Sequence, residues 1–231
     1  MKKKKLLILG GSSDIGEYLA KELLKLNVYN IHIHCNSNSR LLKNNNNIKL
    51  IKADFTLIKE KEISKKFDKN YDIVINLVGY ISNSSFTHFN EKEFYKTIRA
   101  NSLIPILIIR NSLKHMIQNN FGRILNSSSV GVKFGGGEQT YLYSLSKHIN
   151  EFIPNYLKKI SKNNIIYNCL RIGVVNTKLH KKIANKNLNK RKKLIPLNKI
   201  AEKKDISDLI IHLIEKNNFL NNEVINITGG E

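Results

Sequence analysis

Residues Leu6–Gly16 read LLILGGSSDIG, in which four apolar residues run directly into a glycine-rich turn. The apolar residues between Ile15 and Leu26 then recur with close to the period of a helix. A strand, a tight glycine turn and a helix N-terminus form an anion site, because backbone amides point at the anion and glycines let it come close. This stretch predicts such a site, although taken alone it also fits an ordinary strand–helix connection.

The alternation of strand and helix continues along the whole chain, which favours a parallel sheet covered by helices on both faces. Neither an internal repeat nor a domain boundary interrupts it, so we expect one domain over residues 1–231. The predicted strands are Lys5–Leu9, Asn30–Cys35, Ile48–Ala53, Asp72–Val78, Arg123–Ser127, Ile165–Leu170 and Glu223–Ile227. The predicted helices are Ile15–Leu26, Leu57–Phe67, Glu91–Asn119 (one helix or two abutting ones), Thr140–Lys162 and Asp205–Lys216, with Thr177–Lys193 irregular. The predicted fold class is α/β, a doubly wound sheet of about seven parallel strands.

The composition is that of a globular protein, with 231 residues of which 41% are apolar. No apolar run approaches the ~18 residues of a membrane span. The lysines at the N-terminus precede only four apolar residues, fewer than the ~7–15 of a signal peptide, so we expect a cytoplasmic protein. Cys35 and Cys169 are expected to be reduced and packed, and neither they nor the seven histidines have the spacing of a metal site.

The net charge of +21 raises the alternative of a nucleic-acid binder. Lysine, isoleucine and asparagine dominate the composition and arginine is scarce beside lysine, which is typical of codon drift in a low-GC genome. Nucleic-acid sites usually also show arginines, aromatic residues and a recognition motif, and the sequence has none. One local anomaly is residues 152–201, which contain no Asp or Glu and are most basic at 178–193.

Four further motifs follow the glycine turn in a particular order. They are Asn76-Leu77-Val78-Gly79 after an apolar run, Asn101 in a helical stretch, Ser129 at the end of Asn126-Ser127-Ser128-Ser129, and Tyr143-Ser144-Leu145-Ser146-Lys147. In this order, from Leu6 to Gly230, the chain resembles the short-chain dehydrogenase/reductase family, in its single-domain, nicotinamide-dependent branch. The nearest relatives by resemblance are bacterial beta-ketoacyl carrier-protein reductases and similar ketoreductases. The resemblance implies a Rossmann fold and a carbonyl reductase.

The catalytic residues that the resemblance implies are Asn101, Ser129, Tyr143 and Lys147. Tyr-x-x-x-Lys alone would occur about once by chance in a chain this rich in lysine, so its placement carries the weight. Tyr143 and Lys147 lie at i and i+4 on one helix and share a face, fourteen residues after Ser129. Tyrosine is a poor acid near neutrality, and we expect the ammonium and an oxidised nicotinamide to lower its pKa. Ser129 would bind the substrate oxygen, and Asn101 would anchor a water that relays protons from Lys147.

The implied cofactor site lies at the carboxyl ends of the strands, and its residues are Gly10, Ser12, Ser13, Asp14, Ile15, Gly16, Asn36, Ser37, Arg40, Asp54, Phe55, Asn76, Gly79, Tyr143, Lys147, Val175 and Thr177. Asp14 stands where the family usually has glycine, and could cap the following helix. An acid after the second strand would favour NAD. That position here reads Cys35-Asn36-Ser37-Asn38-Ser39-Arg40 without an acid, so we expect NADP(H) to be preferred over NAD(H), unless Arg40 only starts a solvated helix.

The substrate is expected to be a small ketone or its alcohol. The segment at about 177–200 occupies the place of the family's substrate lid, and its basic charge favours an anionic substrate if it is not codon drift. The two arginines with which the carrier-protein reductases bind their partner align near Asn120 and Asn163, which argues against a standard fatty-acid role. We also expect a homotetramer or homodimer and no membrane contact. A catalytically silent dinucleotide-binding or scaffold protein of the same fold remains the alternative.

Overall fold

Seven parallel strands form the centre of the molecule. The computed structural model describes residues 3–36, 47–82, 84–179 and 187–231. The strands lie in the order β3-β2-β1-β4-β5-β6-β7, and every neighbouring pair is parallel. Their bounds are β1 (Lys4–Leu9), β2 (Tyr29–Cys35), β3 (Ile48–Lys52), β4 (Ile73–Asn76), β5 (Gly122–Ser129), β6 (Ile165–Ile172) and β7 (Glu223–Ile227). The order reverses at β1, which pairs with both β2 and β4, so the topological switch point lies at the carboxyl ends of β1 and β4.

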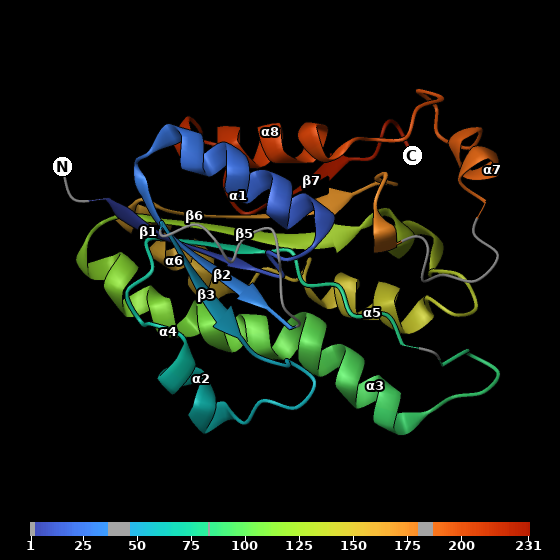
Figure 1. The fold of residues 1–231 in the computed structure, drawn as a ribbon, viewed down its shortest axis with the longest axis horizontal. Helices are drawn as coiled ribbons and strands as arrows, with labels where there is room; N and C mark the ends of the chain where they lie inside the picture. The colour runs from blue at the N-terminus through green and yellow to red at the C-terminus, as the bar shows by residue number, and fades with distance from the viewer. Residues whose placement is uncertain (1–2, 37–46, 83, 180–186) are drawn as a thin grey trace.

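Helices cover both faces of this sheet, as the sequence predicted (Figure 1). α1 and α8 lie on one face, and α2, α3, α4 and α5 lie on the other. The bounds are α1 (Asp14–Leu26), α2 (Glu60–Lys66), α3 (Glu91–Ile98), α4 (Ile104–Gln118), α5 (Tyr141–Ile149), α6 (Asn155–Ile160), α7 (Leu188–Lys192) and α8 (Lys203–Glu215). No helix in the described ranges is long and apolar enough to cross a membrane.

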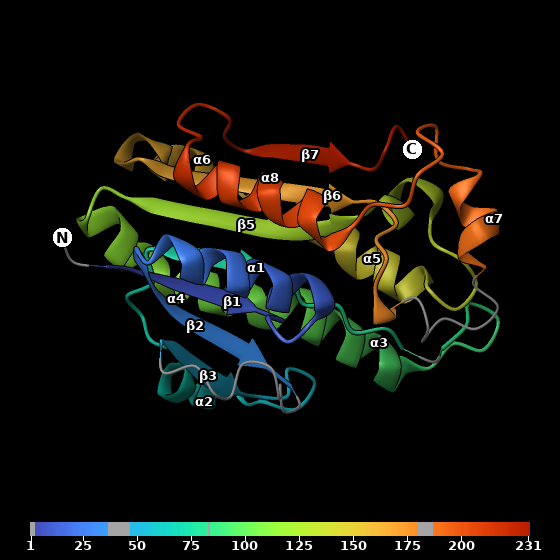
Figure 2. The same cartoon turned by 45° about the horizontal axis from the view of Figure 1, so that its top comes forward.

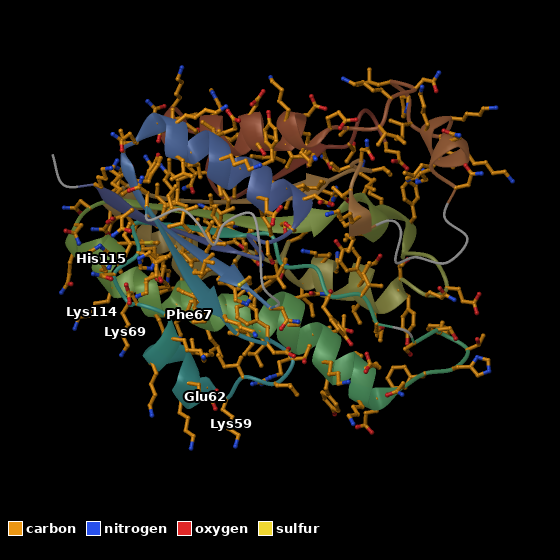
Figure 3. All side chains as sticks on the ribbon, in the orientation of Figure 1. Lys59, Glu62, Phe67, Lys69, Lys114 and His115 are labelled. Carbon is orange, nitrogen blue, oxygen red and sulfur yellow. The ribbon has the colours of Figure 1, made fainter. Side chains whose placement is uncertain are left out.

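The side chains of β1 alternate between two separate cores. Leu6 and Ile8 pack with α1 and α8, whereas Leu7 and Leu9 pack with α4 and α6. All four are fully buried, because a central parallel strand covered on both faces has no solvent-facing side. Figure 3 shows the edge of the second core, where Phe67 points inward after α2 while Lys59 and Glu62 point outward.

The predicted Glu91–Asn119 helix consists of α3 and α4 joined by a π-helical turn at Arg99–Leu103. Pro105 lies in the first turn of α4, directly after the π-helical turn, a position at which proline is tolerated. π-Helical turns are rare and frequently found at functional sites. This one contains Asn101.

Three predictions of local structure were wrong. The Thr140–Lys162 helix is instead α5 and α6 with a break between them, because proline disfavours helical backbone at the residue before it and Pro154 precedes α6. The helix predicted from Leu57 begins only at Glu60, since Asp54 and Thr56 form a turn first. The predicted irregular segment contains the short helix α7, which Asn187 caps by accepting from the amides of Asn189 and Lys190.

Candidate functional site

The predicted site residues that the structure describes gather at one edge of the sheet. Gly10 follows β1, Asn76 ends β4, Ser129 ends β5 and Val175 follows β6. The carboxyl ends of these neighbouring strands point the same way, toward the end of the molecule where α5 and α7 lie (Figure 2). The fold thus brings together motifs that are separated by as much as 165 residues in the sequence (175 − 10).

The glycines of the first turn are required by close packing. Gly10 has φ of +71°, and a Cβ on it would stand 2.9 Å from the Leu77 carbonyl and the Val78 amide. A Cβ on Gly16 would stand 2.5 Å from Gly11 Cα. The turn therefore lies directly against the end of β4 and against the start of α1. The thirteen-residue α1 presents its N-terminus there, which gives the turn the features of an anion cradle.

Ser13, and not Asp14, caps this helix. The Ser13 hydroxyl accepts a hydrogen bond of 3.1 Å from the Gly16 amide. Asp14 is the first residue of α1, and its carboxylate accepts a 2.6 Å hydrogen bond from the backbone amide of Lys178. The Lys178 ammonium lies 3.9 Å from the same carboxylate. Asp14 thereby joins the glycine turn to the start of the basic segment, a contact that its sequence context did not indicate.

The residues after β3 form another side of the implied cofactor site. One carboxylate oxygen of Asp54, Oδ1, is engaged locally, because it accepts from the Thr56 amide at 2.8 Å and from the Thr56 hydroxyl at 2.7 Å. Phe55 is buried and stacks on His34. Asn36 is exposed directly after β2. Ser37 and Arg40, on which the predicted cofactor preference partly rests, lie outside the described residues.

Asn76 fixes the turn after β4. Its side chain is fully buried, donates to Asn126 Oδ1 at 2.7 Å and accepts from the Val78 amide at 3.1 Å. A Cβ on the following Gly79 would lie 3.6 Å from the Tyr143 ring. The glycine therefore leaves open the space directly beside the tyrosine. Asn76 is structural in these contacts, and Gly79 is the residue that borders the predicted catalytic group.

Tyr143 and Lys147 project from α5 toward the ends of β4 and β5. Lys147 is buried, and its ammonium donates to Val78 O at 2.7 Å, to Ser127 O at 3.1 Å and to Ser127 Oγ at 2.9 Å. Burial lowers the pKa of Lys147 to about 8. Ser127 was absent from the predicted site. It precedes Ser129 by two residues on the same strand face, so period-two alternation could have identified it.

We expected Lys147 and an oxidised nicotinamide together to lower the pKa of Tyr143, whereas the protein groups by themselves raise it. Burial raises the Tyr143 pKa to about 12, and the Ser129 hydroxyl beside it only partly opposes the rise. The Lys147 ammonium lies 5.6 Å from the centre of the Tyr143 ring and is directed at the carbonyls of Val78 and Ser127. Without an additional positive charge, desolvation of the phenolate outweighs attraction to the lysine.

Asn101 is buried and every polar atom of its side chain is engaged. Its Oδ1 accepts from the Tyr80 amide at 2.7 Å, and its Nδ2 donates to Tyr80 O and to Ser146 Oγ, both at 2.9 Å. The side chain thus connects the loop after β4 to the π-helical turn and to α5. Its backbone carbonyl, the group available to a water, accepts from Asn150 Nδ2 at 3.1 Å. Asn150 also donates to Ser127 O at 3.1 Å and was not predicted.

The segment after β6 borders the remaining side of the site. Val175 is buried and bridges to Ala201, and Thr177 Oγ donates weakly to Val175 O at 3.4 Å. Residues 180–186 of the predicted lid lie outside the described residues. Beyond them, Arg191 of α7 forms a salt bridge with Glu231. At the ends of β5 and β6, Glu151 accepts from both Ser128 and Arg171. Burial acts to raise the Glu151 pKa, but the hydrogen bonds from Arg171 and Ser128 and the charge of Arg171 outweigh it, so the pKa is lowered.

Comparison with known proteins identifies proteins that are similar to this chain. Residues 4–188 match the family described as short chain dehydrogenase. The chain is 25% identical to 3-oxoacyl-(acyl-carrier-protein) reductase of Aquifex aeolicus, over 97% of this chain and 95% of that protein. It is 26% identical to the reductase of the same description from Buchnera aphidicola subsp. Baizongia pistaciae, over 99% and 97%.

Solved structures extend the similarity to the whole fold. The structure of ElxO with NADP bound is 27% identical and superposes with a TM-score of 0.83, over 99% of this chain and 98% of that one. 4-Hydroxyisoleucine dehydrogenase complexed with NADH is 25% identical with a TM-score of 0.84, over the same fractions. One of these relatives was solved with NADP and the other with NADH.

Proposed function

The chain belongs to the short chain dehydrogenase family, and from that premise we propose that it is an NADP(H)-preferring reductase that converts a ketone to its alcohol, or the reverse. The observation that carries the proposal is the arrangement of Tyr143, Ser129 and Lys147 beside the glycine turn. A proton donor, a hydroxyl and a buried cation thus stand next to a cradle suited to a dinucleotide. Residues 1–231 act as one Rossmann oxidoreductase domain in this proposal.

The residues present suit a nicotinamide dinucleotide. The turn at Gly10 and Gly16 has no room for Cβ atoms, and it leads into the N-terminus of α1, which suits a pyrophosphate. Ser12 and Ser13 belong to this turn and Ile15 to the first turn of α1. Around the same edge lie Asp54, Phe55, Asn76, Gly79, Val175 and Thr177. When bound, the nicotinamide supplies a hydride to the carbonyl carbon.

The protein residues manage the proton and the charge on oxygen. The Tyr143 hydroxyl, whose pKa of about 12 keeps it protonated at neutral pH, gives its proton to the substrate oxygen. The Ser129 hydroxyl donates a hydrogen bond to that oxygen. The Lys147 ammonium, together with a positively charged nicotinamide ring, stabilises the tyrosinate that remains. Lys147 then returns a proton to the tyrosinate and takes one from solvent, and in this proposal the Asn101 carbonyl binds a water on that route. The Asn101 side chain keeps the loop after β4 in place, and Asn150 holds the Asn101 carbonyl by a hydrogen bond.

Several observations support a preference for NADP(H). No acid follows β2, where Asn36 stands, and Arg40 lies four residues farther along the chain. The carboxylate of Asp54 is engaged by Thr56. ElxO, one of the similar structures, holds NADP. The 4-hydroxyisoleucine dehydrogenase holds NADH, and the relative affinities of this chain for NADPH and NADH test the preference.

The substrate is proposed to be a small carbonyl compound carrying negative charge. The relatives of known activity reduce 3-oxoacyl groups on a carrier protein. Asn120 and Asn163 are neutral and bond to each other at 3.1 Å, which leaves no cation at the positions where carrier-protein reductases bind their partner. The basic segment at about 177–200 is proposed to act as a lid over an anionic substrate. The enzyme is proposed to work in the cytoplasm. It is also proposed to be a homotetramer or homodimer, since Leu103 of the π-helical turn, Ile106 of α4 and Leu145 of α5 are exposed apolar side chains.

A direct assay tests the reductase. Oxidation of NADPH and of NADH is followed against a panel of ketones, ketoacyl thioesters and keto-sugars, with Tyr143→Phe as the matched control. Turnover of any panel member by the wild type, lost in the variant, supports the proposal. Binding of either cofactor without turnover of any carbonyl would favour the catalytically silent scaffold.

A further inference from the structure

His34 lies in β2 directly beneath the glycine turn. Its ring is buried and makes two hydrogen bonds, with Gly10 N at 3.1 Å through Nδ1 and with Ala53 O at 2.9 Å through Nε2. A backbone amide can only donate and a backbone carbonyl can only accept. The partners therefore place the single ring proton on Nε2 and leave Nδ1 as the acceptor.

The same residue makes further contacts at the edge of the sheet. Its backbone carbonyl accepts from the Gly11 amide at 3.0 Å. Its ring stacks on Phe55 with centroids 3.8 Å apart and planes 6° from parallel. It also meets Phe67, labelled in Figure 3, at 5.9 Å between centroids. His34 thus contacts two segments of the proposed cofactor site, the turn after β1 and the loop after β3.

We propose that His34 is a positioning residue for the dinucleotide, which holds the glycine turn and the Asp54–Phe55 loop at a fixed separation. The inference rests on the proposed cofactor site and adds a residue to it. Gly10 is wedged between His34 and the end of β4, where a Cβ would stand 2.9 Å from Leu77 C and O. If the acceptor at Nδ1 is lost, the Gly10 amide is left without its partner, and the turn is no longer held in place for the pyrophosphate.

His32 provides a matched control on the same strand. It lies two residues earlier, so its ring points to the same face of the sheet, and it is also buried. Its Nδ1 bonds to the Tyr71 hydroxyl at 2.9 Å, and its nearest acid is Asp68 at 3.8 Å. None of these partners belongs to the glycine turn or to the Asp54–Phe55 loop. A change at His32 therefore tests the general cost of altering a buried histidine in β2.

The two hydrogen bonds of His34 can be separated by substitution. His34→Asn keeps an acceptor on the atom that corresponds to Nδ1, whereas His34→Gln keeps a donor that corresponds to Nε2. His34→Leu keeps neither. We expect the NADPH dissociation constant, measured by nucleotide fluorescence, to rise about tenfold in the leucine variant and by a similar factor in the glutamine variant. The asparagine variant should bind NADPH within about threefold of the wild type.

The kinetic consequence should be confined to the cofactor. KM for NADPH should rise with the dissociation constant while kcat stays within about twofold, because His34 contacts the binding loops and not Tyr143. His32→Leu should lower the unfolding midpoint and leave the NADPH dissociation constant unchanged. That combination distinguishes positioning from a structural contribution to the sheet.

Three results would overturn the inference. They are a folded His34→Leu protein with wild-type affinity for NADPH, an equal loss of affinity in His32→Leu, or equal affinities in the asparagine and glutamine variants. If His34→Leu does not fold, the NADPH affinities of His34→Asn and His34→Gln still test the inference. The failures are distinguishable, because a wild-type protein that binds neither NADPH nor NADH would refute the proposed cofactor itself.

Discussion

Replacement of Lys147 by methionine should change how the stability of the protein depends on pH. Lys147 is 2% exposed, and burial lowers its pKa from the ordinary 10.5 to about 8. Between these two values the unfolded chain binds more protons than the folded one, so stability rises with pH. The contribution of Lys147 is therefore fully present above 10.5 and is lost as pH falls through about 8.

The size of the effect follows from the same shift. A difference of about 2.5 pKa units corresponds to about 3 kcal/mol in total, of which about 2 kcal/mol develops between pH 7 and 9.5. The free energy of unfolding of Lys147→Met should lack this increment, since methionine does not titrate. Other lysines and tyrosines titrate equally in both proteins, so the difference between variant and wild type isolates Lys147.

Urea unfolding at pH 7 and pH 9.5 measures the increment. Lys158→Met, which removes an exposed lysine from α6, is the control and should follow the wild type at both pH values. The same preparation of Lys147→Met should have lost both turnover and tight NADPH binding, because the ammonium is proposed to serve both. Equal changes in unfolding free energy for Lys147→Met and the wild type would refute the argument from burial.

Further substitutions test other parts of the site. Tyr143→Phe should reduce turnover by about 10²–10⁴-fold in a reductase assay while NADPH affinity stays nearly intact, because only proton transfer needs the hydroxyl; activity within a few-fold of the wild type would remove Tyr143 from its role. Asp14→Asn should tighten NADPH binding by about threefold at low ionic strength, since it removes a negative charge beside the proposed pyrophosphate, and the gain should fade in salt; an unchanged affinity in titrations at both salt concentrations would show that the pyrophosphate does not lie there. The pKa of His32 is lowered by burial to about 4, so stability that is present above pH 6.5 should be lost as pH falls toward 4. His32→Phe should remove up to about 3 kcal/mol of that acid dependence in urea titrations, and a variant whose acid dependence matches the wild type would contradict it.

Much of the architecture was predictable from local pattern. Residues that are neighbours in the sequence were enough to predict three features: the alternation of strands and helices, the last strand Glu223–Ile227, and the glycine turn before α1. The carboxyl ends of parallel strands meet at one edge of the sheet. The sequence alone therefore predicted that Gly10, Asn76 and Ser129 lie at the same edge. Pro154 also carried a local signal for the break after α5, and it was overlooked.

The electrostatics of the site depended on the tertiary structure. The direction of the Tyr143 pKa, the carbonyls that hold Lys147 and the partners of Asn101 all come from segments distant in the chain, which pack around each side chain. The contact between Asp14 and Lys178 joins residues 164 positions apart, and the bond between His34 and Gly10 crosses from β2 to the turn after β1. Periodicity and spacing determine which face a residue occupies. Desolvation and hydrogen bonding depend on what covers that face, and this covering exists only once the chain has folded.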